Sequence, residues 1–343
     1  MNNRTEISSL GEFGLIRHLT ERIEIKHSST IKGIGDDAAV LSYEDKQILV
    51  TTDLLLEGIH FDLTYVPLKH LGYKSAVVNF SDIYAMNGQP KQITVSLGIS
   101  NRFSVEDLEE FYAGLKLACD VYNVDIVGGD TSASLTGLCI SITCIGEGEK
   151  DKVTLRNGAK ETDLICVSGD LGAAYMGLQL LEREKRIFKG EKDFTPDFSG
   201  KEYLLERQLK PEARKDIIQM LRNADITPTA MMDISDGLSS ELLHISQESH
   251  VGCRIYEDRI PIDYQTAAMA EQFNMNLVTA ALNGGEDYEL LFTVPLTDHD
   301  KVSEMKGIKV IGHITKQELG NYLVGRDGGE VELKAQGWNS LKQ

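Results

Sequence analysis

The sequence predicts a mixed α/β (α+β) protein that folds in two domains. Strand-like apolar runs alternate with helical segments along most of its 343 residues, a length that exceeds one ordinary hydrophobic core. The alternation is interrupted near residues 148–160, where the chain is charged, contains glycine and shows no apolar periodicity. We therefore expect an N-terminal domain over residues 1–150 and a C-terminal α/β domain over residues 151–343.

The first half of the chain alternates between strands and helices after a polar N-terminal arm. Apolar residues recur at helical spacing over residues 70–88, and Ser104 with Asp107 three residues later is typical of a capping box that begins the next helix. We expect the run that ends at Asp130 to be a buried strand. The expected elements are helices over 12–25, over 70–88 and from 104 onward, and strands over 45–53, 91–100, 124–130 and 137–148.

The second half of the chain also alternates between strands and helices. A strand over 163–172 is followed by a helix over 173–184, and a lysine-, aspartate- and glycine-rich loop is expected over 186–202. The run from residue 230 to 238 predicts a strand that turns into a helix over 239–249. The run over 281–294 predicts a Gly-Gly turn that enters a strand.

Composition argues against several classes of function. The 53 acidic residues outnumber the 35 basic ones and give a net charge of -18, so we expect neither nucleic acid nor an anionic membrane as a partner. No stretch approaches 18 uninterrupted apolar residues, and the N-terminus lacks the apolar core of a signal peptide. The five cysteines form no C-x-x-C pair, which indicates a reducing cytoplasm and no zinc site.

Several apolar strands run directly into carboxylates, and almost no lysine or arginine lies within these motifs. Two like charges ~4 Å apart repel by roughly 4 kcal/mol at an effective dielectric of 20, so five or more gathered carboxylates need cations. The carboxylates are Asp53, Asp130, Asp233 and Asp236 at strand ends, Asp36 and Asp37 in the glycine turn GIGDDAAV, and Asp82 on an otherwise apolar helix.

The neighbouring hydroxyls of Thr51, Thr52 and Ser235 complete a set of ligands that contains only oxygen. Hard oxygen ligands indicate Mg²⁺ or Ca²⁺, and Mg²⁺ held by a few carboxylates and substrate phosphates suits phosphoryl transfer. A single aspartate at a strand end is usually a turn former or a helix cap. Six of them joined to glycine-rich turns favour a metal site.

Familiar phosphate and calcium motifs are missing or incomplete. The chain has no G-x-x-x-x-G-K-[ST] loop, and its G-x-G-x-x-A match over residues 33–38 would place two carboxylates against a pyrophosphate. The segment 233–237 is similar to the start of a calcium loop, but its glycine stands at the fifth position and His244 occupies the twelfth. Neither motif explains the acidic residues.

Eight sequence blocks together resemble one family, the bacterial thiamine-monophosphate kinases. Their superfamily includes aminoimidazole ribonucleotide synthetase, selenophosphate synthetase and a hydrogenase maturation protein. The blocks follow the family order over almost the whole chain, and the combination of TTD-x-x-x-EG-x-HF with GGEDYEL is the most specific. They are GEFGLI, GIGDDAAV, TTDLLLEGIHF, AVVNFSDIYAMNG, VGGDTS, TLRNGA, DISDGL and NGGEDYELLF.

The resemblance implies a fold in two α/β halves, with the first halves of two subunits packed into a shared barrel as a homodimer. It implies an active-site cleft between the halves. There, several Mg²⁺ ions would assist direct transfer of the γ-phosphoryl group of ATP to thiamine monophosphate. The acceptor oxygen of a phosphate monoester already carries charge, so no general base is expected.

The resemblance also implies roles for individual residues. The implied metal ligands are Asp37, Thr51, Thr52, Asp53, Asp82, Asp130, Asp233 and Asp236, with Asp36 adjacent. The implied ATP contacts are Tyr112, Gly129, Asp130, Arg156 and Ser235. The implied acceptor contacts are His60, Glu286 and Trp338. Tyr112 could instead pack as a core aromatic and Trp338 could anchor a C-terminal tail, while Asp287 is expected to be structural.

Some features depart from the family pattern and leave alternatives open. The helix block reads NFSDIYAMNGQP, and the turn SGDLG adds Asp170, which has no assigned role. A different ATP-using member of the superfamily, such as aminoimidazole ribonucleotide synthetase or the hydrogenase maturation protein, is the enzymatic alternative. A nucleotide- or metal-binding module without turnover is the other, although the intact TTD, GGDT and DISDGL motifs argue against it.

Overall fold

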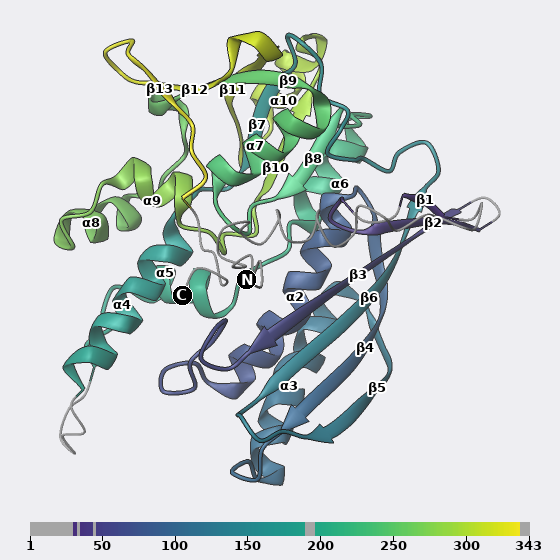
Figure 1. Ribbon diagram of the computed structural model, residues 1–343, viewed down its shortest axis with the longest axis vertical. Helices are drawn as coiled ribbons and strands as arrows, with labels where there is room; N and C mark the ends of the chain where they lie inside the picture. The colour runs from purple at the N-terminus through teal and green to yellow at the C-terminus, as the bar shows by residue number, and fades with distance from the viewer. Residues whose placement is uncertain (1–29, 33–34, 44–45, 189–195, 337–343) are drawn as a thin grey trace, which may run out of the picture.

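The computed structural model describes residues 30–32, 35–43, 46–188 and 196–336. The helix expected over 12–25 and Trp338 lie outside these residues. Strands and helices alternate as expected for a mixed α/β protein, and the strands form two separate sheets (Figure 1). None of the helices in the described part of the chain combines the length and the hydrophobicity that a membrane crossing requires.

In the described part of the chain, the first sheet has six strands in the order β1-β2-β3-β6-β4-β5. Neighbouring strands are antiparallel except for β4 and β5, which are parallel. The chain supplies them in order as β1 Thr30–Lys32, β2 Ala39–Tyr43, β3 Lys46–Leu56, β4 Gln89–Ile99, β5 Asp125–Ala133 and β6 Cys139–Glu149.

Two helices accompany this sheet, α2 (Leu68–Ala85) and α3 (Val105–Tyr122). The predicted capping box is confirmed, because the Ser104 hydroxyl accepts from the Asp107 N–H while the Asp107 carboxylate accepts from the Ser104 N–H. The helices cross with their backbones in contact: a Cβ on Gly114 would lie 1.7 Å from the Lys69 carbonyl oxygen. Only glycine permits this approach.

The prediction of a buried strand ending at Asp130 is wrong. Strand β5 continues to Ala133, lies at the edge of the sheet and is exposed along its whole length, including Ile126 and Val127. An apolar run of this kind has the same sequence pattern whether the strand is central or lies uncovered at an edge. Its place in the sheet, which sequence periodicity does not encode, therefore decides its burial.

The second sheet has seven strands among the described residues, in the order β13-β12-β9-β11-β7-β10-β8. Its pairs are antiparallel apart from β12 with β9. The strands are β7 Leu164–Ser168, β8 Ala230–Asp233, β9 Val251–Tyr256, β10 Leu290–Val294, β11 Ile308–Lys316, β12 Asn321–Val324 and β13 Glu330–Glu332.

The second half of the chain also contains α-helices, and the short helices α5, α6, α8, α9 and α10 were not predicted. The α-helices are α4 Ala173–Ile187, α5 Glu202–Leu209, α6 Lys215–Asn223, α7 Leu238–Ser249, α8 Tyr264–Gln272, α9 Leu277–Asn283 and α10 His299–Glu304. Single 3₁₀ turns are η2 Glu257–Arg259, η3 Leu296–Asp298 and η4 Gln317–Leu319.

Helix α2 joins the two halves. It packs on β3, β4 and β6 of the first sheet and on β8 of the second, and almost all of its residues are buried (Figure 1). Phe80 of this helix and Phe292 of β10 belong to one hydrophobic core that extends across both sheets. The described strands of neither sheet close into a barrel.

Candidate active site

Three of the predicted carboxylates meet between the two sheets. Oxygens of Asp37, Asp82 and Asp233 lie within 4.8 Å of one another, although these residues precede β2, lie in α2 and end β8. Hydroxyl groups hold two of them, because Thr51 donates to Asp82 at 2.5 Å and Ser81 donates to Asp233 at 2.6 Å. The fold therefore turns a scattered sequence pattern into one acidic cluster.

The electrostatics of this cluster favour a bound cation. Burial, together with the charges of Asp53, Asp233 and Asp37, raises the pKa of Asp82 well above its ordinary value. Burial and the neighbouring Asp37 raise the pKa of Asp233 to about 8, and burial raises that of Asp53 to about 6. The raised pKa values show that burial of several negative charges together is unfavourable, and a divalent ion would stabilise the ionised carboxylates.

Arg156, which the resemblance assigns to ATP, supplies a positive charge beside Asp37, and the sequence did not predict this pairing. Its guanidinium donates to Asp37 from Nε at 2.8 Å and pairs from Nη2 at 2.7 Å, a two-point contact across about 120 residues of chain. The side chains of Asp36 and Asp37 are 0% and 2% exposed. Burial and Asp37 nevertheless raise the pKa of Asp36 to about 6, so Arg156 offsets the local negative charge only in part.

The structure does not bring Thr52 and Asp130 into this cluster. Thr51 and Asp53 face α2, so Thr52 faces the opposite side of the sheet, where its hydroxyl contacts Thr143 at 3.1 Å. Asp130 aligns with Ser96 of β4 and stands on that same uncovered side. Three strand spacings, or roughly 14 Å, separate β3 from β5. The predicted ligands thus divide between the two faces of one sheet.

The DISDGL loop is organised by Glu241, a residue that the motif analysis missed. Its carboxylate accepts from the backbone N–H groups of Ser235 at 3.0 Å and Asp236 at 2.7 Å. Glu241 is buried, and burial together with Asp236 raises its pKa well above the ordinary value. Gly237 follows with a φ of 118°, a backbone conformation that a residue with a Cβ rarely adopts. Glu241 therefore fixes the backbone beside two predicted site residues.

Glu286 lies next to this loop. Its N–H donates to the Ser235 carbonyl at 2.7 Å, and its carboxylate pairs with Lys74 of α2 at 2.9 Å and accepts from Gln208 of α5 at 2.8 Å. His60 is exposed, and its Nδ1 accepts from the Leu56 N–H at 3.0 Å. Sequence spacing could not link Glu286 to Lys74, since 212 positions separate them.

Two of the residues predicted to bind the nucleotide lie in exposed parts of the first half, whereas Arg156 lies beside Asp37 and Ser235 lies in the DISDGL loop. Tyr112 of α3 is 40% exposed and packs against Phe111 edge to face, so it is only partly a core residue. Gly129 belongs to β5, which is uncovered. A Cβ on Gly129 would lie 1.9 Å from the Val95 carbonyl oxygen, so this strand position requires glycine.

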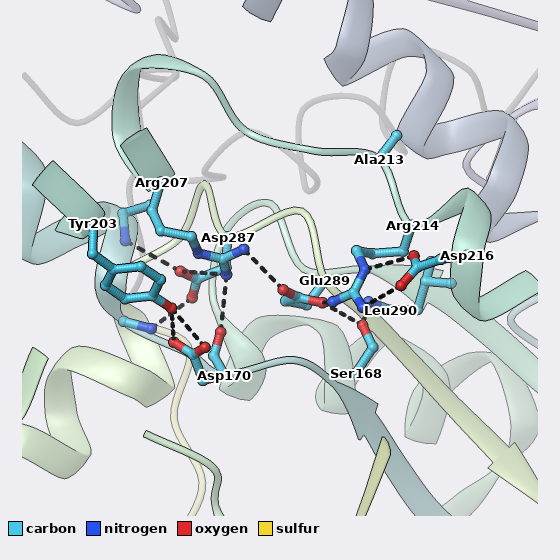
Figure 2. Close-up of polar contacts among 12 residues, drawn as sticks. Ser168, Asp170, Tyr203, Arg207, Ala213, Arg214, Asp216, Asp287, Glu289 and Leu290 are labelled. Atoms are coloured by element: carbon cyan, nitrogen blue, oxygen red, sulfur yellow. Dashed lines mark hydrogen bonds and ion pairs between the residues drawn. The ribbon is translucent and has the colours of Figure 1, made fainter. Parts of the chain in front are cut away.

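Asp170 and Asp287 have structural partners (Figure 2). The Asp287 carboxylate accepts from the Gly172 N–H at 2.8 Å beside the start of α4, in agreement with its expected structural role. Asp170, unassigned from sequence, accepts from the Tyr203 hydroxyl at 2.7 Å and 2.6 Å. Glu289 lies between Arg207, which contacts it at 2.9 Å, and Arg214. These contacts anchor the segment that includes α5.

Comparison with known proteins agrees with this geometry. The family model described as AIR synthase related protein, N-terminal domain, matches residues 35–147. A thiamine-monophosphate kinase of Aquifex aeolicus (strain VF5) is 36% identical over 315 residues, which cover 89% of this chain and 96% of that protein. The thiamine-monophosphate kinase of Bacillus subtilis (strain 168) is 33% identical over 341 residues, 97% of this chain and 100% of that protein.

Solved structures show the same likeness. The structure described as "AaThiL complexed with AMPPCP and TMP" has a TM-score of 0.84 at 36% identity and covers 98% of this chain and 99% of its own. The hydrogenase maturation protein HypE in complex with ATP, at 18% identity and a TM-score of 0.68, shares the fold and covers 99% of this chain and all of its own. Because the relatives named for the kinase match nearly full length and three of the predicted acidic residues meet between the sheets, this chain belongs to the thiamine-monophosphate kinase family.

Proposed function

We propose that this protein transfers the γ-phosphoryl group of ATP to thiamine monophosphate and so forms thiamine diphosphate. The observation that carries the proposal is the cluster of Asp37, Asp82 and Asp233 between the two halves, in a chain whose relatives are named for this reaction. The solved relative was described with an ATP analogue and TMP, the two kinds of ligand that the reaction brings together.

The residues present fit Mg²⁺. The cluster offers only oxygen ligands, and its buried carboxylates repel one another in the absence of a cation. We assign Asp37, Asp53, Asp82 and Asp233 to this site, with Thr51 and Asp236 adjoining it. When bound, Mg²⁺ ions would neutralise the charge that develops on the transferred phosphoryl group and align the two phosphates.

The protein's own part in the reaction is to position charges. Arg156 lies against Asp37, where its guanidinium can turn toward nucleotide phosphates, and Ser235 presents its side chain from a loop that Glu241 fixes. The acceptor is a phosphate monoester whose oxygen already carries charge, so no group need remove a proton. Alignment and electrostatic stabilisation therefore account for the rate enhancement in this proposal.

The two halves of the chain would have different roles in binding and catalysis. Every described strand of the first sheet precedes residue 150, and every one of the second follows residue 163. We assign residues 1–150 to ATP and Mg²⁺ binding and to dimerisation, and residues 151–343 to completion of the cleft. The acidic cluster supports this division, because Asp37 and Asp82 come from the first half and Asp233 from the second.

A direct assay tests the function. Purified protein with ATP, Mg²⁺ and thiamine monophosphate should form ADP and thiamine diphosphate in equal amounts, measured by separation of the products. EDTA in excess should lower the rate to background and added Mg²⁺ should restore it, because every assigned ligand is an oxygen. Full activity after chelation would contradict the metal assignment. Consumption of ATP without thiamine diphosphate would point to another member of the superfamily.

We also propose that two copies associate through the uncovered side of the first sheet. Leu54 is exposed there, and β5, whose Ile126 and Val127 are also exposed, leaves an edge without a neighbouring strand in the described chain. Long exposed edges with apolar side chains invite pairing with another chain. A second copy would cover these residues together with Thr52 and Asp130, the predicted ligands that the single chain leaves apart from the cluster.

Val127→Asp is expected to convert a dimer into a monomer, because it places a charge in the apolar interface. Val331→Asp on β13 is the matched control, since Val331 is 64% exposed and Val127 is 56% exposed. Sedimentation equilibrium should give twice the chain mass for the wild type and the control, and one chain mass for Val127→Asp. A wild-type protein that stays monomeric at micromolar concentration would exclude the dimer.

A further inference from the structure

Both carboxylate oxygens of Glu286 are held by buried side chains from the other elements around it. Lys74 Nζ lies 2.9 Å from Oε1, and Gln208 Nε2 donates to Oε2 at 2.8 Å. Lys74 also donates to the Gln208 carbonyl oxygen at 3.0 Å, so the three residues form a closed set of contacts. Lys74 and Gln208 are buried, whereas the Glu286 side chain keeps 31% of its surface exposed.

The backbone of Glu286 is equally constrained. Its φ is 58°, in the left-handed region, and its N–H bonds to the Ser235 carbonyl. A Cβ on Gly285 would lie 2.6 Å from the same carbonyl oxygen, so the NGGED and DISDGL loops run in direct contact. A partly exposed carboxylate fixed at its backbone and at both oxygens has the rigidity of a binding group rather than that of a surface charge.

Helix α2 sets the distance between Glu286 and the acidic cluster. Lys74 and Ser81 are seven residues apart, which places them on one face of the helix and roughly 10 Å apart along its axis. Ser81 holds Asp233 of the cluster, and Lys74 holds Glu286. A ligand with a phosphate at the cluster would therefore extend about two helical turns to reach Glu286.

The neighbour of Gln208 in α5 is locked in place as well. Arg207 contacts Glu289 at 2.9 Å and donates to the Asp170 carbonyl oxygen at 2.9 Å (Figure 2). Glu289 is in turn held by the Ser168 hydroxyl at 2.5 Å and by Arg214. This buried set fixes the end of α5, and so it fixes the amide of Gln208 that faces Glu286.

We propose that Lys74 and Gln208 are positioning residues that hold Glu286 ready for the cationic end of the phosphorylated acceptor. The inference rests on the proposed function, in which the acceptor is thiamine monophosphate with its positively charged thiazolium ring. Lys74 and Gln208 hold the carboxylate in one orientation, and the exposed part of Glu286 faces the ligand. Neither residue belongs to the acidic cluster, so we expect their effect to be confined to binding of the acceptor.

The test is a double-mutant cycle on Lys74 and Glu286. Lys74→Met should raise the acceptor KM about tenfold, equivalent to a coupling of about 1.4 kcal/mol, while the ATP KM changes by less than about twofold. In the Glu286→Ala background, Lys74→Met should change the acceptor KM by less than about twofold, because the group it positions is gone. Lys69→Met, a substitution of an exposed lysine on the same helix, is the control and should behave as wild type.

If Lys74→Met folds poorly, Gln208→Met tests the same role, because it removes the other side chain that holds the Glu286 carboxylate. Thermal unfolding is measured for every variant. An equal rise of both KM values, or a rise in acceptor KM that persists in the Glu286→Ala background, overturns the positioning role. If the wild type neither binds nor phosphorylates thiamine monophosphate, the proposed function fails and the inference falls with it. If the wild type uses this acceptor while Lys74→Met and Gln208→Met leave its KM unchanged, only the inference is overturned.

Discussion

Asp82→Asn is expected to lower kcat by at least about 100-fold and to leave the fold intact. Asp82 lies at the centre of the acidic cluster, within 4.8 Å of both Asp37 and Asp233. The amide of asparagine keeps an oxygen that can accept from the Thr51 hydroxyl, so the local packing is preserved. The substitution removes the charge that would bind a cation, and with it the neutralisation of the phosphates.

Although Asp82→Asn should lower kcat, it should not lower the free energy of unfolding. The pKa of Asp82 in the folded protein is raised above its value in the unfolded chain, by burial first and by Asp53, Asp233 and Asp37 next. Its contribution to the free energy of unfolding is therefore greatest at low pH and is lost as the pH rises through the folded-state pKa. Without metal at pH 8, Asp82→Asn should match or exceed the wild type in Tm.

The two quantities are measured together as kcat with saturating Mg²⁺ and Tm in EDTA. Asp300→Asn on α10 is the matched control, because Asp300 is 99% exposed and should alter neither value. A near-normal kcat for Asp82→Asn would show that Asp82 does not belong to the active site. A large drop in Tm would instead show that the carboxylate supports folding.

Free thiamine is expected to be phosphorylated with a kcat/KM at least about 1,000-fold below that of thiamine monophosphate. Its hydroxyl is neutral and must lose a proton to become a good nucleophile, whereas the monophosphate already presents a charged oxygen. The monophosphate also brings phosphate oxygens that can share the cations of the acidic cluster, and free thiamine lacks these charged oxygens. Both differences act on the reacting end of the acceptor.

Initial rates with the two acceptors, at one saturating ATP concentration, measure this discrimination. Glu286→Ala is an informative comparison, because it should weaken both acceptors by a similar factor and so leave their ratio almost unchanged. That outcome would place Glu286 at the ring end, away from the phosphate. Use of thiamine as efficiently as its monophosphate would overturn a mechanism without a general base.

The sequence alone predicted local structure, the family and the presence of an acidic cluster. The capping box at Ser104 and Asp107 depends on contacts within four residues, so its prediction held in detail. The ordered motif blocks identified the family, and the concentration of aspartates at strand ends and glycine turns predicted an acidic cluster. One further signal was present but unused: adjacent residues on a strand face opposite sides, which separates Thr52 from Thr51 and Asp53.

The sequence did not predict which side chains distant along the chain form ion pairs, because such pairing depends on how the helices and strands pack. Arg156 pairs with Asp37, Lys74 pairs with Glu286, and these pairs join segments that no local pattern relates. The exposure of β5 likewise follows from its place at the sheet edge. Sequence periodicity reports which residues share a face of one element, whereas the burial, partner and pKa of each carboxylate depend on the elements that the completed fold packs against it.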